Sequence, residues 1–271
     1  MFALLTPRTA LDRLGTHLRN GDGDRPATAL FRLAPTLSAG HEVAVFAGLD
    51  RVLRYLSALR VTDSEVAWLR SRPALREVLT EAVEGFLRDF RWRGDVDALP
   101  EGSVAPPGAP VLRLAGSAAE VGWVVSFVLA AVASETSVAT AAAHAVASHR
   151  GASVVEDSLG VVDPASAAHV ARAAWVGGCA GSTLEQAGFT FGVPVLSPGT
   201  DARFVFAPPV GPFVHHHDDD DAPAPETFRA WMRRGKFVAD LASLETAAHD
   251  ARERAAYALA HLVDERRWSL R

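Results

Sequence analysis

Apolar side chains recur at helical spacing in two segments of the first hundred residues. In residues 41–70 they stand at Val45, Leu49, Val52, Leu53, Leu56 and Leu59. The sequence that starts at Thr62 (TDSE) then has the form of a capping box, which opens a new helix. In residues 74–91 the helical period returns and ends before Gly94. The pattern predicts two helices with a short joint, followed by a third helix.

The residue pattern changes between residues 94 and 116. Short β-branched stretches alternate there with Pro and Gly, which favours strands joined by tight turns. Residues 118–148 are rich in Ala and Val and apolar on nearly all sides, as expected of a helix packed between two layers. We therefore predict one domain over residues 1–117 and a second over residues 118–271, linked by this helix.

Buried-strand patterns dominate the second half. Short apolar runs at 152–155, 192–196 and 237–239 are separated by Ala-rich helical stretches, which indicates a parallel α/β unit. Residues 208–225 interrupt this pattern with a Pro-bounded, loop-like segment that contains three His and four Asp residues. His215, His217 and Asp219 have donor atoms for a divalent metal, but a solvated loop is the favoured interpretation and no metal is assigned.

Composition narrows the classes of function. The formal net charge of −5, without a long basic block, argues against nucleic acid or anionic membrane partners. The longest uncharged apolar run, residues 121–134, is shorter than the ~20 residues that a membrane span needs, and the start lacks the shape of a secretory signal. A cytoplasmic protein is expected. The single cysteine, Cys179, excludes an internal disulfide and is predicted to be buried.

Several motifs carry a resemblance to a known family. The strongest is FLRDFRWRGDV at residues 86–96, followed by PEG at 100–102 and PVL at 110–112. LLT at 4–6 and FAGL at 46–49 precede it, and AAWVGG at 173–178, GST at 181–183 and GVPV at 192–195 follow. In order and spacing these motifs resemble nicotinate phosphoribosyltransferases. The resemblance implies an α/β fold with an N-terminal α/β domain and an incomplete (β/α) barrel of the type II phosphoribosyltransferase kind.

The same resemblance implies that catalytic groups are missing. Phosphoribosyl pyrophosphate is highly anionic, and its leaving pyrophosphate needs Arg, Lys or a metal. Pro7 and Thr9 stand where the family has an Asp and a Tyr, and the equivalent of its paired arginines is EDSLGV, residues 156–161, without a positive charge. Arg203 replaces the histidine of the family's Gly-Thr-x-Ala-His motif, and a guanidinium is neither a base nor a phosphoryl acceptor.

Later segments of the family have no counterpart before Arg271, and only the stretch at 237–240 faintly resembles the next barrel strand. Half a barrel leaves strand edges that another surface must cover. The expected partner is therefore a second copy of this chain or a longer homologue.

Three functions remain open. The first is a non-catalytic subunit that self-associates or binds a partner. The second is a divergent enzyme or small-molecule binder for a pyridine, nucleotide or phosphorylated ligand. Its candidate residues at the strand ends are Glu156, Asp157, Thr200, Asp201 and Arg203. The third is an active pentosyltransferase completed by another subunit. Only that third function implies phosphoribosyl pyrophosphate and ATP with Mg²⁺; otherwise no cofactor and no catalytic residue is assigned.

Overall fold

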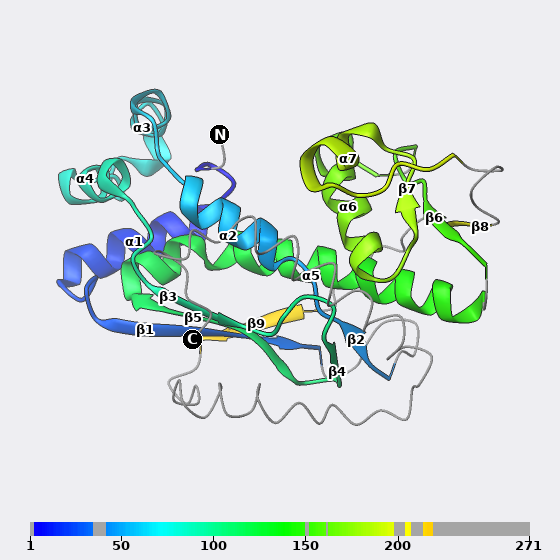
Figure 1. Cartoon of the computed structure of the whole chain (residues 1–271). Helices are drawn as coiled ribbons and strands as arrows, with labels where there is room; N and C mark the ends of the chain where they lie inside the picture. Colours follow the sequence, from blue (N-terminus) through cyan, green and yellow to red (C-terminus); the bar gives the residue numbers. More distant parts are fainter. Residues whose placement is uncertain are drawn as a thin grey trace.

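The computed structural model describes residues 3–34, 42–149, 152–160 and 162–197, and the backbone of two strands at 204–206 and 214–218 (Figure 1). The helices are α1 Arg8–Asn20, α2 Leu49–Ala58, α3 Asp63–Arg70, the 3₁₀ turn η2 Pro73–Leu75, α4 Glu81–Asp89, α5 Ala118–Ser148, α6 Pro164–Val176 and α7 Glu185–Phe191. The strands are β1 Pro26–Leu33, β2 Ala44–Val45, β3 Asp95–Ala98, β4 Val104–Ala105, β5 Pro110–Ser117, β6 Val154–Glu156, β7 Gly181–Ser182, β8 Phe204–Phe206 and β9 Val214–Asp218.

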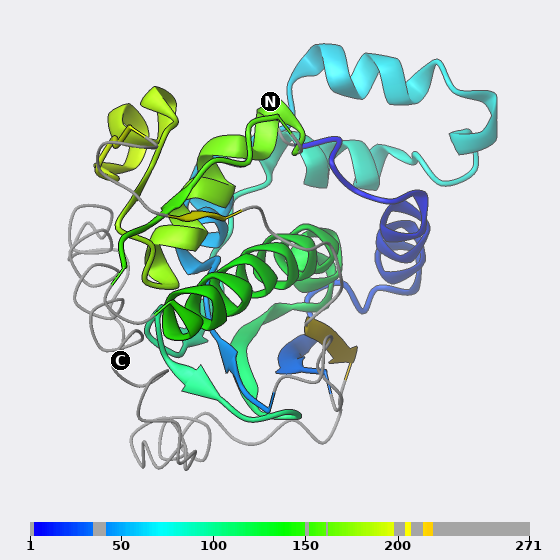
Figure 2. The same cartoon turned by 90° about the vertical axis from the view of Figure 1, so that its right-hand side faces the viewer.

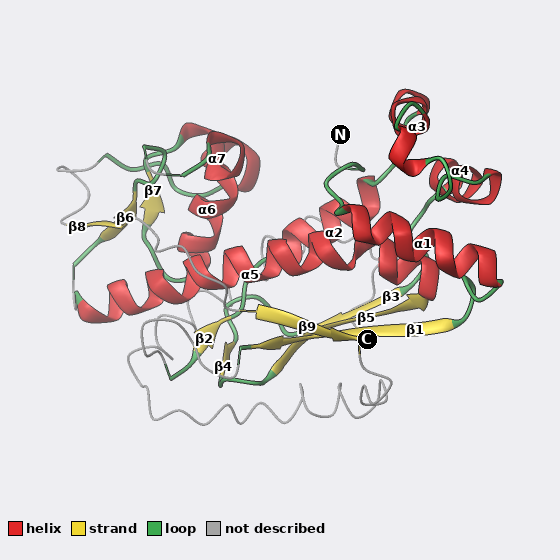
Figure 3. Ribbon diagram, turned by 180° about the vertical axis from the view of Figure 1, so that it is seen from behind, coloured by secondary structure: helices red, strands yellow, loops and turns green. Residues whose placement is uncertain are grey.

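An antiparallel sheet forms the first layer. Its strand order is β3-β5-β1-β9, and β1 pairs with β5 from Pro26 opposite Ser117 to Arg32 opposite Pro110. Helices α1 and α5 lie on one face of this sheet, as the view from behind shows (Figure 3). The core between the two layers contains Phe31 and Trp123, which are almost completely buried.

Helix α5 packs against elements from both halves of the chain. It begins directly after β5 with a reciprocal capping box between Ser117 and Glu120. Its first half packs on the antiparallel sheet, and its second half packs against α6 (Figure 2). The helix is long and apolar enough to cross a membrane, but 67% of its most apolar window is buried inside the protein. Such burial is typical of the core helix of a globular fold.

A small parallel sheet forms the second half. Its strands have the order β7-β6-β8, and Val195 adds a parallel bridge to Ser182. The strand predicted at 152–155 is confirmed as β6, which runs parallel to β7 and β8. Within 192–196 a single bridge at Val195 forms instead of the predicted buried strand. The prediction at 237–239 lies outside the described residues. Cys179 is buried.

Three local predictions were wrong. Residues 44–45 form strand β2 instead of the start of a helix, because Gly48 with φ 103° separates them from α2. Residues 74–91 are not one helix, because η2 ends at Leu75 and Thr80 caps a new helix, α4. Residues 214–218, predicted within a loop, form strand β9 and pair antiparallel with β1.

Candidate functional site

Glu156 occupies the carboxyl end of β6, where parallel α/β folds commonly place ligands. Its side chain is hydrogen-bonded to neighbouring residues and is only 2% exposed. The backbone N–H and the hydroxyl of Ser158 both donate to Oε1, and the Ser182 hydroxyl donates to Oε2 at 2.5 Å. Both carboxylate oxygens therefore already have protein donors, and Glu156 serves to join β6 to β7.

Asp157 lies at the same edge but faces solvent. Its Oδ1 accepts a hydrogen bond of 2.8 Å from the hydroxyl of Thr183, which follows β7. The described residues at these two strand ends thus provide two carboxylates and three hydroxyls, and no cation. The charge of these two carboxylates is unfavourable for an anion such as pyrophosphate.

The structure places only some of the predicted site residues. Glu156 and Asp157 come together at the strand ends, as the sequence indicated. Thr200, Asp201 and Arg203 lie outside the described residues. Among the weak metal candidates, His215 and His217 belong to β9, whose backbone alone is described, and Asp219 lies outside. Within the part of the chain with described side chains, no cluster of three potential metal ligands occurs.

A buried ionic cluster, which the sequence analysis did not find, joins the two halves of the chain. Its members are Asp50 on α2, Glu101 between β3 and β4, Glu135 on α5, and Arg172 and His169 on α6. Arg172 is 0% exposed and binds Glu101 through two hydrogen bonds of 3.1 and 2.5 Å. Burial opposes the charge on Arg172, but the surrounding carboxylates outweigh burial and raise its pKa.

Glu101 also holds the start of α2. Its Oε1 accepts hydrogen bonds from the backbone N–H groups of Gly48 at 2.7 Å and Leu49 at 3.0 Å. These donors lie at a helix N-terminus, where a carboxylate is favoured. One carboxylate therefore connects α2 with Arg172 on α6, and the junction of the two halves is built around it.

Glu135 and His169 form the unsatisfied part of this cluster. The Glu135 carboxyl is buried, its ion-pair distances to Arg51 and Arg172 are both 3.8 Å, and neither carboxyl oxygen has a hydrogen-bond partner among the described residues. Burial raises the pKa of Glu135 to about 8 and lowers the pKa of His169 to about 4. At neutral pH both are uncharged, with Oε1 of Glu135 at 3.5 Å from Nδ1 of His169.

These pKa values predict a loss of stability between pH 6.5 and 8. In this window unfolded Glu135 is ionised while the folded carboxyl still holds its proton, so raising the pH favours the unfolded chain. His169 has the opposite effect, but only between about pH 4 and its ordinary pKa of 6.5. We expect the free energy of unfolding to fall by about 2 kcal/mol from pH 6.5 to 8. Urea denaturation should show this slope, and Glu135→Gln should remove it.

Comparisons with known proteins identify the class of protein that shares this fold. Residues 17–133 match the model of the nicotinate phosphoribosyltransferase (NAPRTase) N-terminal domain. The crystal structure of human nicotinic acid phosphoribosyltransferase superposes with a TM-score of 0.64 at 27% identity, over 71% of this chain and 38% of the human chain. Nicotinate-nucleotide pyrophosphorylase from Pyrococcus furiosus shares the fold, with a TM-score of 0.54 at 20% identity over 71% of this chain and 40% of its own.

Sequence relatives give the same result. Nicotinate phosphoribosyltransferase pncB1 of Mycobacterium tuberculosis is 35% identical over 192 residues, which are 70% of this chain and 41% of the relative. Nicotinate phosphoribosyltransferase pncB2 of the same organism is 32% identical over 174 residues, 62% of this chain and 36% of the relative. Over residues 17–133 the chain has the N-terminal domain of the nicotinate phosphoribosyltransferase family. It spans about two fifths of the length of the first of these relatives.

Proposed function

We propose that this chain is a nicotinate phosphoribosyltransferase-like protein that has lost the transferase reaction and works in the cytoplasm as a self-associating or partner-binding subunit. The parallel strands β6 and β7 and the strand segment at Val195 would be the first strands of the barrel found in complete members of the family. A second copy or a longer homologue would cover their open edge.

The acidic strand ends carry this proposal. Transfer of the phosphoribosyl group from phosphoribosyl pyrophosphate requires positive charge or a metal where the pyrophosphate departs. The equivalent edge here presents Glu156 and Asp157, and Glu156 is fully engaged by Ser158 and Ser182. Three donors from the protein already occupy this buried carboxylate, and its charge opposes an anionic substrate.

Substitutions elsewhere in the chain also support the loss of the transferase reaction. Pro7 lacks the carboxylate, and Thr9 lacks the aromatic ring, that the family resemblance would place at these two positions. Arg203 stays protonated at any working pH and cannot accept a phosphoryl group as histidine does. Three separate parts of the expected machinery are therefore replaced by residues of different chemistry.

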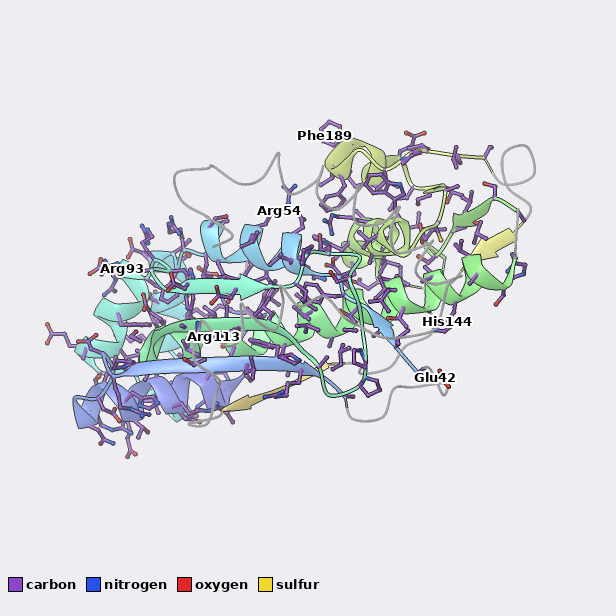
Figure 4. All side chains as sticks on the ribbon, turned by 60° about the horizontal axis from the view of Figure 1, so that its bottom comes forward. Glu42, Arg54, Arg93, Arg113, His144 and Phe189 are labelled. Carbon is purple, nitrogen blue, oxygen red and sulfur yellow. The ribbon has the colours of Figure 1, made fainter. Side chains whose placement is uncertain are left out.

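An exposed apolar surface on the second half supports a binding role. Phe189 on α7 is 90% exposed and points outward (Figure 4), and Val195, packed beside Gly188, is 40% exposed. Leu159, which follows β6, is 47% exposed. An exposed aromatic side chain is the kind of residue that can anchor an interface.

Light scattering on the purified chain tests the subunit role. We expect a mass of at least about twice the 28.8 kDa of one chain, or a complex when a full-length nicotinate phosphoribosyltransferase is added. Phe189→Asp should weaken that association about tenfold or more, because a charge would enter a desolvated contact. Leu5→Asp, at a residue 56% exposed in the N-terminal half, is the matched control and should change nothing. A monomer that binds neither copy nor homologue would refute the subunit role.

A further inference from the structure

A pocket of about 310 Å³ lies in the N-terminal half, between the carboxyl end of α2 and the connection from α4 to β3. Leu56, Ser57 and Arg60 form one wall, and residues 91–94 form the other. Figure 4 shows Arg93 in the half built on the antiparallel sheet, far along the molecule from Phe189 and His144. The pocket is therefore separate from the strand ends at Glu156, and nothing inferred from it depends on the proposed function.

The charge of this pocket is opposite to that of the whole protein. Three of its lining residues, Arg60, Arg91 and Arg93, are arginines, and none is acidic, although the formal net charge of the chain is −5. Arg93 makes no hydrogen bond or ion pair with another described residue, and Nη1 of Arg91 donates to the backbone carbonyl of Phe90 at 2.5 Å. Two guanidinium groups thus reach the pocket without a carboxylate to neutralise them in the described part of the chain.

Backbone contacts hold the walls in place. Nη1 of Arg60 donates to the carbonyl oxygens of Ser57 at 3.2 Å and Leu59 at 2.6 Å, which fixes this side chain against the end of α2. Gly94 allows the opposite wall to lie on β5, since a Cβ there would be 2.2 Å from the carbonyl oxygen of Ala115 and 2.7 Å from the ring of Trp92. The arginine-bearing connection is therefore fixed before any ligand binds.

Trp92 also lines the pocket, but its indole Nε1 is shielded from solvent and is therefore out of reach of a ligand there. The charged lining residues are all arginines, which carry hydrogen-bond donors and no acceptor. They match a ligand made of acceptors.

We propose that this pocket binds the phosphate group of a small phosphorylated molecule. Guanidinium groups bind phosphate oxygens through paired hydrogen bonds, and phosphate offers more acceptors and charge than one carboxylate. The cavity has the size of a site for a small metabolite and not only for an isolated ion. Arg91 and Arg93 provide the attraction, and Arg60 belongs to the fixed wall.

Calorimetric titration with pyrophosphate at low ionic strength tests this assignment. We expect one site per chain, and a loss of affinity of about tenfold for each of Arg91→Gln and Arg93→Gln. Both side chains are exposed, so both variants should keep the unfolding temperature of the parent chain. Arg76→Gln, at an exposed arginine outside the pocket, is the matched control and should bind pyrophosphate like the parent.

Three results would overturn the proposal. Absence of pyrophosphate binding by the parent chain would remove the site. An equal loss of affinity in Arg76→Gln would show diffuse attraction by surface charge. Equal affinity for malonate, a dicarboxylate without phosphate, would exclude recognition of phosphate itself.

Discussion

Replacing Arg172 by methionine is expected to destabilise the protein by about 3–5 kcal/mol, because it leaves a buried carboxylate without its cation. Arg172 and Glu101 are each 0% exposed, and they are linked by two hydrogen bonds. The destabilisation would extend beyond α6, since Glu101 also accepts hydrogen bonds from the first backbone N–H groups of α2. Urea denaturation followed by circular dichroism measures the effect.

Two companion variants separate the charge from the shape of the side chain. Arg8→Met removes an exposed ion pair with Asp12 and should cost no more than about 1 kcal/mol. The double variant Arg172→Met/Glu101→Gln should cost less than the sum of its single changes, because no uncompensated charge remains buried. Equal losses for Arg172→Met and Arg8→Met would contradict the role given to this cluster.

Trp123→Ala should destabilise the protein by about 3–5 kcal/mol. Trp123 is 1% exposed and lies in the core between α5 and the antiparallel sheet. Removing its indole leaves a cavity that the two layers cannot close without losing their own contacts. The far-ultraviolet circular dichroism signal is the suitable probe, since the substitution also removes a fluorophore.

Trp123→Phe is the informative control for this position. Phenylalanine keeps part of the volume and removes Nε1, which has no hydrogen-bond partner among the described residues. The expected loss is about 1–2 kcal/mol, well below that of alanine. If alanine were tolerated as well as phenylalanine, Trp123 would not fill a rigid core.

Local signals account for the parts of the fold that the sequence predicted well. The capping box at Thr62 and Glu65 forms as expected and opens α3. The apolar composition of residues 118–148 reflects a helix with a sheet on one side and α6 on another. A mixed α/β fold follows from these elements.

The segment before residue 34 was not predicted, because its structure depends on distant contacts. Strand β1 carries Arg32 and begins with Pro26, so its own sequence gives a weak strand signal. Its central place results from pairing with β5 on one side and β9 on the other. The His-rich sequence of β9 likewise reads as a loop until β1 provides a partner edge.

In the candidate site, too, residues with a local sequence signal could be predicted, and residues brought together from distant elements could not. Glu156 and Asp157 could be placed at a strand end because they directly follow a buried apolar run. The ionic cluster could not, since Asp50, Glu101 and Arg172 come from three elements with no common spacing. The one local hint is a charged residue inside an otherwise apolar helical stretch, as Glu135 is in α5 and Arg172 is in α6.

Formation of nicotinate mononucleotide tests the central claim most directly. The purified 271-residue chain would be incubated with nicotinate, phosphoribosyl pyrophosphate and Mg²⁺, with and without ATP, beside a full-length nicotinate phosphoribosyltransferase under the same conditions. We predict product from the full-length enzyme and none above background from this chain. Product that forms with this chain alone, and that follows it through repeated purification, would contradict the loss of the transferase reaction.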